Sequence, residues 1–329
     1  MKKEFAKLEG ATILVTGGAG FVGSNLIKQL LDCGARVICF DNFSTGKKEN
    51  ITEFFSDSNF ILIEGDANKK EELFQAFKDS TVDYVFHYAA TVGVVRTIEQ
   101  PLAVLHDIQG IQTILEFSRQ RGVKKVMFAS SSEVYGEPLE LPEKEDGRLN
   151  AELPYATVKL IGEHYLKAYY TTFGLKTCSL RFFNVYGPKQ DSSSYGFVAG
   201  VFLRQALQGN NLTVFGKGNQ TRDFVYVDDN IEASLLALVS DSTNGKVMNI
   251  GVGKPTTILQ LAQAVQHLCH NPKVAINFLP LRKGGEIIHR CPDINKMKEY
   301  INFVPQYSLE AGLQKTFEWY KNNLERLSL

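Results

Sequence analysis

A glycine-rich segment directly follows the first short apolar run of this 329-residue chain, and it limits the folds available. Residues 13–15 read Ile-Leu-Val, and Gly17, Gly20 and Gly23 precede an amphipathic stretch that ends near Gly34. A buried strand, a tight glycine turn and a helix, in this order, begin a strand–helix–strand unit with parallel strands. The pattern recurs through the first half of the chain, where the predicted strands are 37–40, 60–63, 84–86, 126–129 and 178–182, and the predicted helices are 21–31, 101–121 and one that begins near Tyr155.

The alternation predicts an α/β fold of the Rossmann type, a doubly wound parallel sheet with helices on both faces. Beyond Gly187 the alternation weakens into shorter segments, which indicates a smaller mixed α/β lobe at the C-terminal end. We expect residues 1–187 to form a Rossmann domain that binds a dinucleotide and carries the catalytic side chains. Residues 188–329 would form the substrate-binding lobe, with some crossing of the chain between lobes. Open α/β sheets bind ligands at the carboxyl ends of their strands, so the two lobes should share a cleft there.

Charge and composition narrow the classes of partner. Lys and Arg number 36, as do Asp and Glu, so the formal net charge is zero, which argues against binding to nucleic acid or to an anionic membrane. The charged first residues lack the apolar run of a signal peptide, and no apolar run is long enough for a bilayer, so a cytoplasmic location is expected. The five cysteines fit reduced thiols, and His267 and His270 lack further ligands at a matching spacing, so no metal site is expected.

Two aspartates close predicted strands at places where a dinucleotide needs hydrogen-bond acceptors. Asp41 ends the second strand, where its carboxylate can accept from both ribose hydroxyls and repel a 2′-phosphate, which favours NAD over NADP. Asp66 ends the third strand and can accept from the adenine amino group. The alternative is that both aspartates only begin turns. Backbone N–H groups of the glycine loop would bind the pyrophosphate.

Tyr155 and Lys159 stand four residues apart in a predicted helix, so the phenol and the ammonium share one face. A neighbouring cation favours phenolate over phenol, which makes a tyrosine usable as a base near neutral pH. Because alcohol oxidation requires a base beside a nicotinamide, the pair predicts NAD-dependent chemistry on an alcohol.

These segments together resemble the extended short-chain dehydrogenase/reductase family, and within it the NAD-dependent nucleotide-sugar epimerases, dehydratases and decarboxylases. The resemblance covers essentially the whole chain and depends on the order and spacing of its motifs. The motifs are residues 16–24 (TGGAGFVGS), Asp41-Asn42, Gly65-Asp66, His87-x-Ala89-Ala90, residues 130–136 (SSSEVYG), Tyr155-x-x-x-Lys159, and residues 181–188, 213–216 and 220–229.

The resemblance implies a tightly held NAD and a nucleoside-diphosphate sugar as substrate. Ser131 matches the residue that hydrogen-bonds the reacting 4-hydroxyl beside Tyr155, and Lys159 matches the lysine that binds the nicotinamide ribose and lowers the tyrosine pKa. The residues that the resemblance assigns to the cofactor are Gly17, Gly20, Phe21, Val22, Gly23, Asp41, Asn42, Asp66, Ala89, Tyr155 and Lys159. Those that it assigns to the substrate are Ser132, Asn184, Arg222 and Arg282, the last three on the diphosphate, and Thr213, Val214 and Phe215 at the base.

The resemblance leaves the outcome of the reaction open at Glu133. Oxidation of the sugar at carbon 4, the first step that the family shares, gives a 4-ketone. An epimerase reduces this ketone again on its other face, and a dehydratase removes water. A decarboxylase removes carbon dioxide when carbon 5 carries a carboxylate. Glu133 matches the carbon-5 base of family dehydratases, but Ser132 replaces their general acid. The Ser-Glu pair and residues 289–293 are similar to UDP-glucuronate decarboxylases, whereas residues 41–46 resemble the epimerase loop.

We therefore expect a 4-epimerase that acts on a UDP-hexose or a UDP-N-acetylhexosamine. A dehydratase or decarboxylase that uses Glu133 as a catalytic residue is the alternative, and a structural Glu133 that pairs with a nearby donor is a further one. A catalytically inactive, NAD-sensing regulator is the least favoured, because such proteins lose the tyrosine or the lysine and this chain keeps both.

Two features of the predicted helices complete the comparison with the family. Asp107 stands where the family usually carries an asparagine, and no role is assigned to it. The family is commonly dimeric through two helices of its first domain, so a homodimer through the helices that begin at Pro101 and Tyr155 is expected. The same apolar residues would equally serve a core within one chain.

Overall fold

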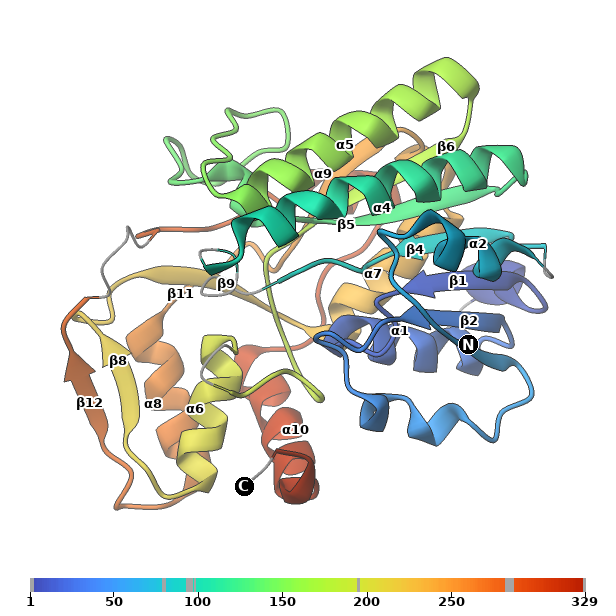
Figure 1. Cartoon of the computed structure of the whole chain (residues 1–329). Coiled ribbons are helices and arrows are strands. Elements are labelled where there is room, and N and C mark those ends of the chain that lie inside the picture. The colour runs from blue at the N-terminus through green and yellow to red at the C-terminus, as the bar shows by residue number, and fades with distance from the viewer. Residues whose placement is uncertain are drawn as a thin grey trace.

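The computed structural model describes residues 3–78, 81–92, 97, 99–193, 196–281 and 287–327. Its main element is a seven-stranded sheet in the order β10-β6-β5-β4-β1-β2-β3, in which all neighbouring strands are parallel (Figure 1). The predicted Rossmann-type α/β fold is therefore confirmed. The strands are β1 (Thr12–Thr16), β2 (Arg36–Asp41), β3 (Phe60–Glu64), β4 (Tyr84–His87), β5 (Lys125–Ser131), β6 (Lys176–Phe182) and β10 (Lys246–Ile250).

Successive side chains of β1 to β5 enter two separate cores, one on each face of the sheet. In β1, Ile13 and Val15 belong to the first core and Leu14 to the second. The helices on the first face are α1 (Phe21–Asp32) and α7 (Val227–Val239), and those on the second are α2 (Lys70–Lys78), α4 (Pro101–Gln120) and α5 (Pro154–Phe173).

The boundaries of α5 place its first turn beside the strand ends. α4 and α5 both begin with a proline, whose fixed φ suits a helix start and whose missing N–H would be unpaired there in any case. α5 ends at Gly174, which adopts a φ of +72°, the left-handed conformation that commonly closes a helix. Tyr155 therefore lies in the first turn of α5.

The smaller lobe is mixed in its strand directions and lies apart from the large sheet (Figure 1). One small sheet has the order β11-β9-β7, with an antiparallel and a parallel pair, and β8 pairs in parallel with β12. The strands are β7 (Asn184–Tyr186), β8 (Leu212–Phe215), β9 (Thr221–Tyr226), β11 (Pro255–Thr257) and β12 (Ile276–Leu279). The remaining helices are α6 (Val198–Leu207), α8 (Ile258–Cys269), α9 (Asn295–Ile301) and α10 (Leu309–Lys321), and the short 3₁₀ turns are Lys3–Leu8, Lys48–Asn50, Thr52–Phe54, Ser132–Tyr135, Asp241–Thr243 and Leu324–Leu327.

The chain returns to the large sheet after residue 188. α7 packs on α1, and β10 pairs with β6 at the edge of the sheet. Lys125, which is 3% exposed, donates from Nζ to the carbonyl oxygens of Ala237 (2.8 Å) and Ser240 (2.7 Å). A buried ammonium thus joins the start of β5 to the end of α7.

Two negative findings hold for the described ranges. None of their helices combines the length and the apolar character that crossing a bilayer requires. They also contain no group of three or more His, Cys, Asp or Glu side chains arranged to hold a metal ion.

Candidate active site

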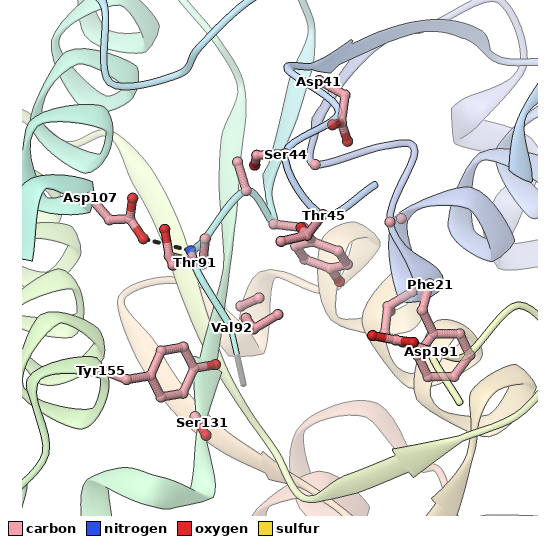
Figure 2. Close-up of a pocket in the computed structure, with 18 of the residues that line it drawn as sticks. Phe21, Asp41, Ser44, Thr45, Thr91, Val92, Asp107, Ser131, Tyr155 and Asp191 are labelled. Carbon is pink, nitrogen blue, oxygen red and sulfur yellow. Dashed lines mark hydrogen bonds between the residues drawn. The ribbon is translucent and has the colours of Figure 1, made fainter. Parts of the chain in front are cut away.

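A pocket of about 950 Å³ lies where the strands of the large sheet end (Figure 2). Its walls come from the segments that follow β1 to β5, and the smaller lobe adds Lys189, Phe197 and Trp319. Pockets for small ligands and cofactors span roughly 300–1,000 Å³, so this one can hold a large ligand. Its place is the one where open α/β sheets bind their ligands.

The glycine loop forms one wall, and Gly17, Gly20, Phe21, Val22 and Gly23 all line the pocket. Gly17 has a φ of +70°, and a Cβ at this position would lie 2.7 Å from the backbone nitrogen of Ala89. A Cβ at Gly23 would overlap the carbonyl oxygen of Gly17. No side chain of the described residues caps α1, so its first N–H groups are left for an anion. The cradle therefore fits the pyrophosphate of NAD.

Asp41 lies beside this cradle, where its carboxylate is held in a fixed orientation. Oδ2 accepts from the backbone N–H of Ala19 (2.9 Å), and Oδ1 accepts from that of Phe43 (2.8 Å). Burial raises the pKa of Asp41, while the two N–H donors lower it. Each carboxylate oxygen can accept a second hydrogen bond, so the side chain fits the predicted ribose acceptor. The neighbouring Asn42 also lines the pocket, and its Oδ1 accepts from the N–H of Ser44 (3.0 Å).

Asp66 and Ala89 also lie on the pocket wall. Oδ1 of Asp66 accepts from the N–H of Asn68 (2.9 Å), so this aspartate forms a turn while it faces the pocket. Asp66 can therefore begin a turn, as the alternative states, and still be available to accept from the adenine amino group. The N–H of Ala89 donates to Oγ1 of Thr16 (3.2 Å), whose hydroxyl also bonds Nδ1 of the buried His87 (2.8 Å).

Ser131 and Tyr155 meet at the pocket (Figure 2), and Lys159 lines the same pocket. Ser131 ends β5, and its side chain lies close enough to the Tyr155 hydroxyl to lower the pKa of that tyrosine. The Lys159 ammonium lies 5.5 Å from the centre of the Tyr155 ring and 4.8 Å from that of Phe128. Three side chains from β5 and α5, predicted to act together, are thus brought together.

The pKa values of this trio are governed by burial. Burial raises the pKa of Tyr155, against the lowering effect of the Ser131 hydrogen bond, and it lowers the pKa of Lys159 to about 8. The direction for Tyr155 is opposite to the one that its spacing from Lys159 predicts. The reason is that burial disfavours the charged phenolate, and this effect outweighs the lowering effect of Ser131.

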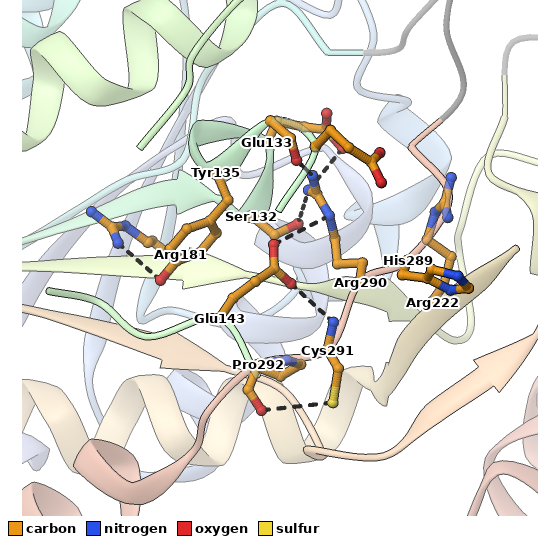
Figure 3. A network of polar contacts seen from close by, with 12 residues as sticks. Ser132, Glu133, Tyr135, Glu143, Arg181, Arg222, His289, Arg290, Cys291 and Pro292 are labelled. Atoms are coloured by element: carbon orange, nitrogen blue, oxygen red, sulfur yellow. Dashed lines mark hydrogen bonds and ion pairs between the residues drawn. The ribbon is translucent and has the colours of Figure 1, made fainter. Parts of the chain in front are cut away.

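Glu133 and Ser132 form a second cluster with Arg290 (Figure 3). Arg290 is 1% exposed, and its Nη1 donates to Oγ of Ser132 (2.8 Å) and to Oε1 of Glu133 (3.2 Å). Its Nη2 donates to the carbonyl oxygen of Gly136 (2.8 Å), and Nε lies 3.7 Å from Oε1 of Glu143. Glu133 therefore has the nearby donor that the structural alternative requires, and it lines the pocket as well.

Some of the predicted substrate-binding residues line this pocket and others do not. Asn184 and Ser132 line the pocket. The other described ones lie outside the lining of this pocket: Thr213, Val214 and Phe215 are on β8, with Val214 fully buried, and Arg222 is on β9 with Nη1 donating to the carbonyl oxygen of Thr221 (2.8 Å). Arg282 lies outside the described residues.

Trp319 and Asp107 are among the pocket residues for which no role was predicted. Trp319, the single tryptophan of the chain, lines it from α10. Asp107 lines it from α4 and accepts from the N–H of Thr91 (2.7 Å) and from Nδ2 of Asn68 (2.9 Å). The departure from the family at residue 107 was the available signal for Asp107, whereas Trp319 carried none.

Comparison with known proteins finds a matching family model and similar relatives. Residues 13–251 match the family model described as the NAD dependent epimerase/dehydratase family. The chain is 37% identical over 319 residues to a UDP-N-acetyl-alpha-D-glucosaminuronate decarboxylase of Bacillus cytotoxicus, covering 94% of this chain and 97% of the relative.

Solved structures are similar over nearly the whole chain. A UDP-glucose 4-epimerase of Thermotoga maritima, solved with UDP-glucose, has a TM-score of 0.89 at 36% identity, covering 95% of this chain and 99% of that one. A UDP-N-acetylglucosamine 4-epimerase of Methanobrevibacter ruminantium, in complex with UDP-N-acetylmuramic acid, has a TM-score of 0.89 at 34% identity, with the same coverage of 95% and 99%.

Proposed function

The chain belongs to the NAD-dependent epimerase/dehydratase family, and we propose that within it the protein is a nucleotide-sugar 4-epimerase. The observation that carries this proposal is the meeting of Ser131, Tyr155 and Lys159 in one pocket with the glycine cradle. Alcohol oxidation needs a base, a partner for the hydroxyl and a hydride acceptor in one place, and this pocket provides the first two beside the binding site for the third.

The chemistry that bound NAD would supply is acceptance of a hydride from the sugar and its later return. Backbone N–H groups at the start of α1 would hold the pyrophosphate of NAD, and Asp41 would accept from its ribose hydroxyls. Tyr155 would take the proton of the 4-hydroxyl while Ser131 holds that hydroxyl by a hydrogen bond. Lys159 would bind the nicotinamide ribose and favour the phenolate. Turning of the 4-keto sugar before the hydride returns would give the 4-epimer.

The substrate class is drawn from the relatives that bind UDP-glucose or UDP-N-acetylmuramic acid. As the family resemblance implies, Asn184, Arg222 and Arg282 would bind the diphosphate, and Thr213, Val214 and Phe215 would bind the base. In this assignment residues 1–187 bind the cofactor and residues 188–329 bind the substrate, with α7 and β10 crossing back to the large sheet.

A homodimer through α4 and α5 forms part of the proposal. These two helices pack side by side on one face of the large sheet (Figure 1). Leu105 on α4 is 37% exposed and Phe173 on α5 is 54% exposed, so apolar side chains remain uncovered in one chain. Sedimentation of the purified protein tests this, and a monomer at micromolar concentration would contradict it.

A carbon-5 lyase is the second candidate, and the Arg290 cluster favours it. The guanidinium holds Glu133 and Ser132 beside the pocket, and a positive charge there would also suit a substrate carboxylate on carbon 5. The relative of Bacillus cytotoxicus is a decarboxylase of a sugar acid, which accords with this candidate.

One experiment separates the candidates. The purified protein is incubated in deuterated water with UDP-, dTDP-, CDP- and GDP-sugars, including UDP-glucuronate, and the products are read by NMR. We expect a 4-epimer without solvent deuterium. Deuterium at carbon 5 or loss of carbon dioxide would establish the lyase instead, and NAD binding without turnover of any sugar would indicate a regulator.

Two variants sharpen this test. Tyr155→Phe should abolish turnover, with Tyr165→Phe on the same helix as the matched control, and full activity of Tyr155→Phe would remove Tyr155 from the mechanism. Glu133→Gln should reduce an epimerase only modestly, whereas a lyase would lose nearly all activity.

A further inference from the structure

Lys189 is a nearly buried cation in the wall of the pocket, and it stands shortly after β7, the first strand of the smaller lobe. Its side chain is 6% exposed. Nζ donates to the carbonyl oxygen of Asn50 (2.8 Å) and to Oε1 of Glu53 (2.8 Å), and it lies 5.2 Å from the centre of the Phe54 ring. These partners belong to the two 3₁₀ turns after β2. One ammonium therefore joins the start of the smaller lobe to a distant segment of the large one, since the contact with Asn50 spans 139 residues.

The backbone of Lys189 has a conformation that an L-residue adopts only at a cost. Its φ is +70°, in the left-handed region that favours glycine. The carbonyl oxygen of the preceding Pro188 accepts from Nδ2 of Asn25 on α1 (3.0 Å), so α1 fixes this turn of the chain. Strain of this kind persists where the surrounding contacts impose it. A lysine where glycine would be unstrained indicates that the contacts of the side chain contribute to the site.

Asn50 extends the contact to the cofactor cradle. It is 7% exposed and lines the pocket, and its Nδ2 donates to the carbonyl oxygen of Ala19 in the glycine loop (2.9 Å). The N–H of Lys47 donates to the same oxygen (3.0 Å). The N–H of Ala19 donates in turn to Oδ2 of Asp41 (2.9 Å), the proposed acceptor for the ribose. Three successive hydrogen bonds thus connect the ammonium of Lys189 to the carboxylate of Asp41.

The two 3₁₀ turns are also attached to the protein away from the pocket. Ile51 and Phe54 are buried in the first core. Loss of the Lys189 ammonium should therefore leave the turns folded while it frees the carbonyl oxygen of Asn50 at the pocket wall. We expect the effect on the cofactor site rather than on the fold as a whole.

We propose that Lys189 is a positioning residue of the cofactor site, which fastens the turns at 48–54 to the start of the smaller lobe and thereby keeps Asn50 on the glycine cradle. A site whose groups are held in the binding geometry releases its ligand more slowly. Bound NAD should therefore leave faster when this contact is removed. The inference rests on the NAD site of the proposed function and is independent of the outcome of the sugar reaction.

The rate of NADH release tests this role without any turnover. The protein is loaded with NADH and mixed with excess NAD, and release is followed through the fluorescence of Trp319, which lines the same pocket. Lys189→Met should release NADH about tenfold faster, as expected for loss of a hydrogen bond from a charged group. Lys189→Arg keeps the charge and the donors, so it should restore most of the slow release.

Lys48→Met is the matched control for the loss of a positive charge. Lys48 stands in the same turns, is exposed, and has its ammonium over the Phe55 ring (6.0 Å), outside the lining of the pocket. Its release rate should equal that of the natural protein. Equal acceleration in Lys48→Met and Lys189→Met would show that charge alone governs release, and it would overturn the proposal.

A double-mutant cycle separates positioning from a direct contact with the cofactor. Asn50→Ala removes the next hydrogen bond, the one to Ala19, so Lys189→Met should change the release rate little in that background. If the two effects on the rate multiply, Lys189 acts by itself and the proposal is wrong. If Lys189→Met does not fold, Asn50→Ala decides, because an unchanged release rate in that variant would contradict the chain of contacts.

Urea unfolding of each variant without cofactor shows whether the fold is preserved. A folded Lys189→Met variant that releases NADH at the natural rate would overturn the role of Lys189 and leave the proposed function intact. If the natural protein binds no NADH, the proposed cofactor site fails instead.

Discussion

Replacing Gly17 by alanine should damage both the fold and the cofactor cradle, and the size of the effect follows from two contributions. With a φ of +70°, an L-residue at this position costs about 1–2 kcal/mol. The new Cβ would also lie 2.7 Å from the backbone nitrogen and 2.9 Å from the Cα of Ala89, atoms that cannot move without shifting the end of β4. Such overpacking costs a further 1–3 kcal/mol or so, which gives a total of about 2–5 kcal/mol.

Gly122 offers a matched control for the conformational contribution. It also has a φ of +70°, but a Cβ there would meet nothing within 4 Å. Gly122→Ala should therefore lose only about 1–2 kcal/mol of unfolding free energy. The difference between the two variants, about 1–3 kcal/mol, isolates the contact with Ala89.

Urea unfolding and cofactor titration measure the two consequences together. Unfolding gives the stability of each variant, and the fluorescence of Trp319 reports NADH because this residue lines the same pocket. Gly17→Ala should bind NADH far more weakly than the natural protein, and Gly122→Ala should bind it equally well. The reasoning would be refuted if Gly17→Ala were no less stable than Gly122→Ala and bound NADH unchanged.

Two further predictions concern buried charges. Burial lowers the pKa of His87 from 6.5 to about 3, so below pH 6.5 the unfolded chain takes up a proton at His87 that the folded protein does not. The free energy of unfolding should therefore fall by about 2 kcal/mol between pH 6.5 and pH 5. The variant His87→Gln should remove this pH dependence. An equal pH dependence in that variant, measured by urea unfolding, would contradict the assignment. Glu163→Gln should lose about 3–5 kcal/mol because it leaves the guanidinium of Arg181 buried without its ion pair, whereas Glu116→Gln, in an exposed pair with Arg119, should lose less than about 1 kcal/mol. Similar losses in these two variants would show that burial does not strengthen the Arg181 pair.

The early strands could be predicted because each is a short buried run with a turn signal at its end. The predicted 13–15, 37–40 and 60–63 lie inside β1, β2 and β3. β10 was not predicted to join the large sheet. Its segment contains Asn249, whose buried side chain accepts from the hydroxyl of Tyr135 (2.7 Å) and donates to the carbonyl oxygen of Glu143 (2.9 Å). Both partners are more than a hundred residues away in sequence, so no local pattern shows that this polar residue can be buried.

In the candidate site, too, the residues with a local sequence pattern could be predicted, whereas the contacts between distant segments could not. Gly17, Asp41 and the Tyr155–Lys159 pair could be located because each follows from its place at a strand end or on a helix face. The contact between Arg290 and Ser132 spans 158 residues and depends on how the lobes pack, so the sequence contained only a resemblance for it. Burial raises the pKa of Tyr155, and this effect could not be predicted because spacing along a helix does not report how much water the final packing excludes.

The late return of β10 to the sheet has a consequence for how the molecule is made and how it can be cut. While the chain is being synthesised, one edge of β6 remains unpaired until β10, which ends at Ile250, has left the ribosome. Until residues 237–240 have been made, the ammonium of Lys125 also lacks its acceptors, the carbonyl oxygens of Ala237 and Ser240. A fragment that stops at residue 187 would leave β6 with an unpaired edge and the ammonium of Lys125 without its acceptors on Ala237 and Ser240. We therefore expect that residues 1–187 cannot be transplanted by themselves, and that an exchange of residues 188–329 between relatives would have to leave residues 227–250 with the original sheet.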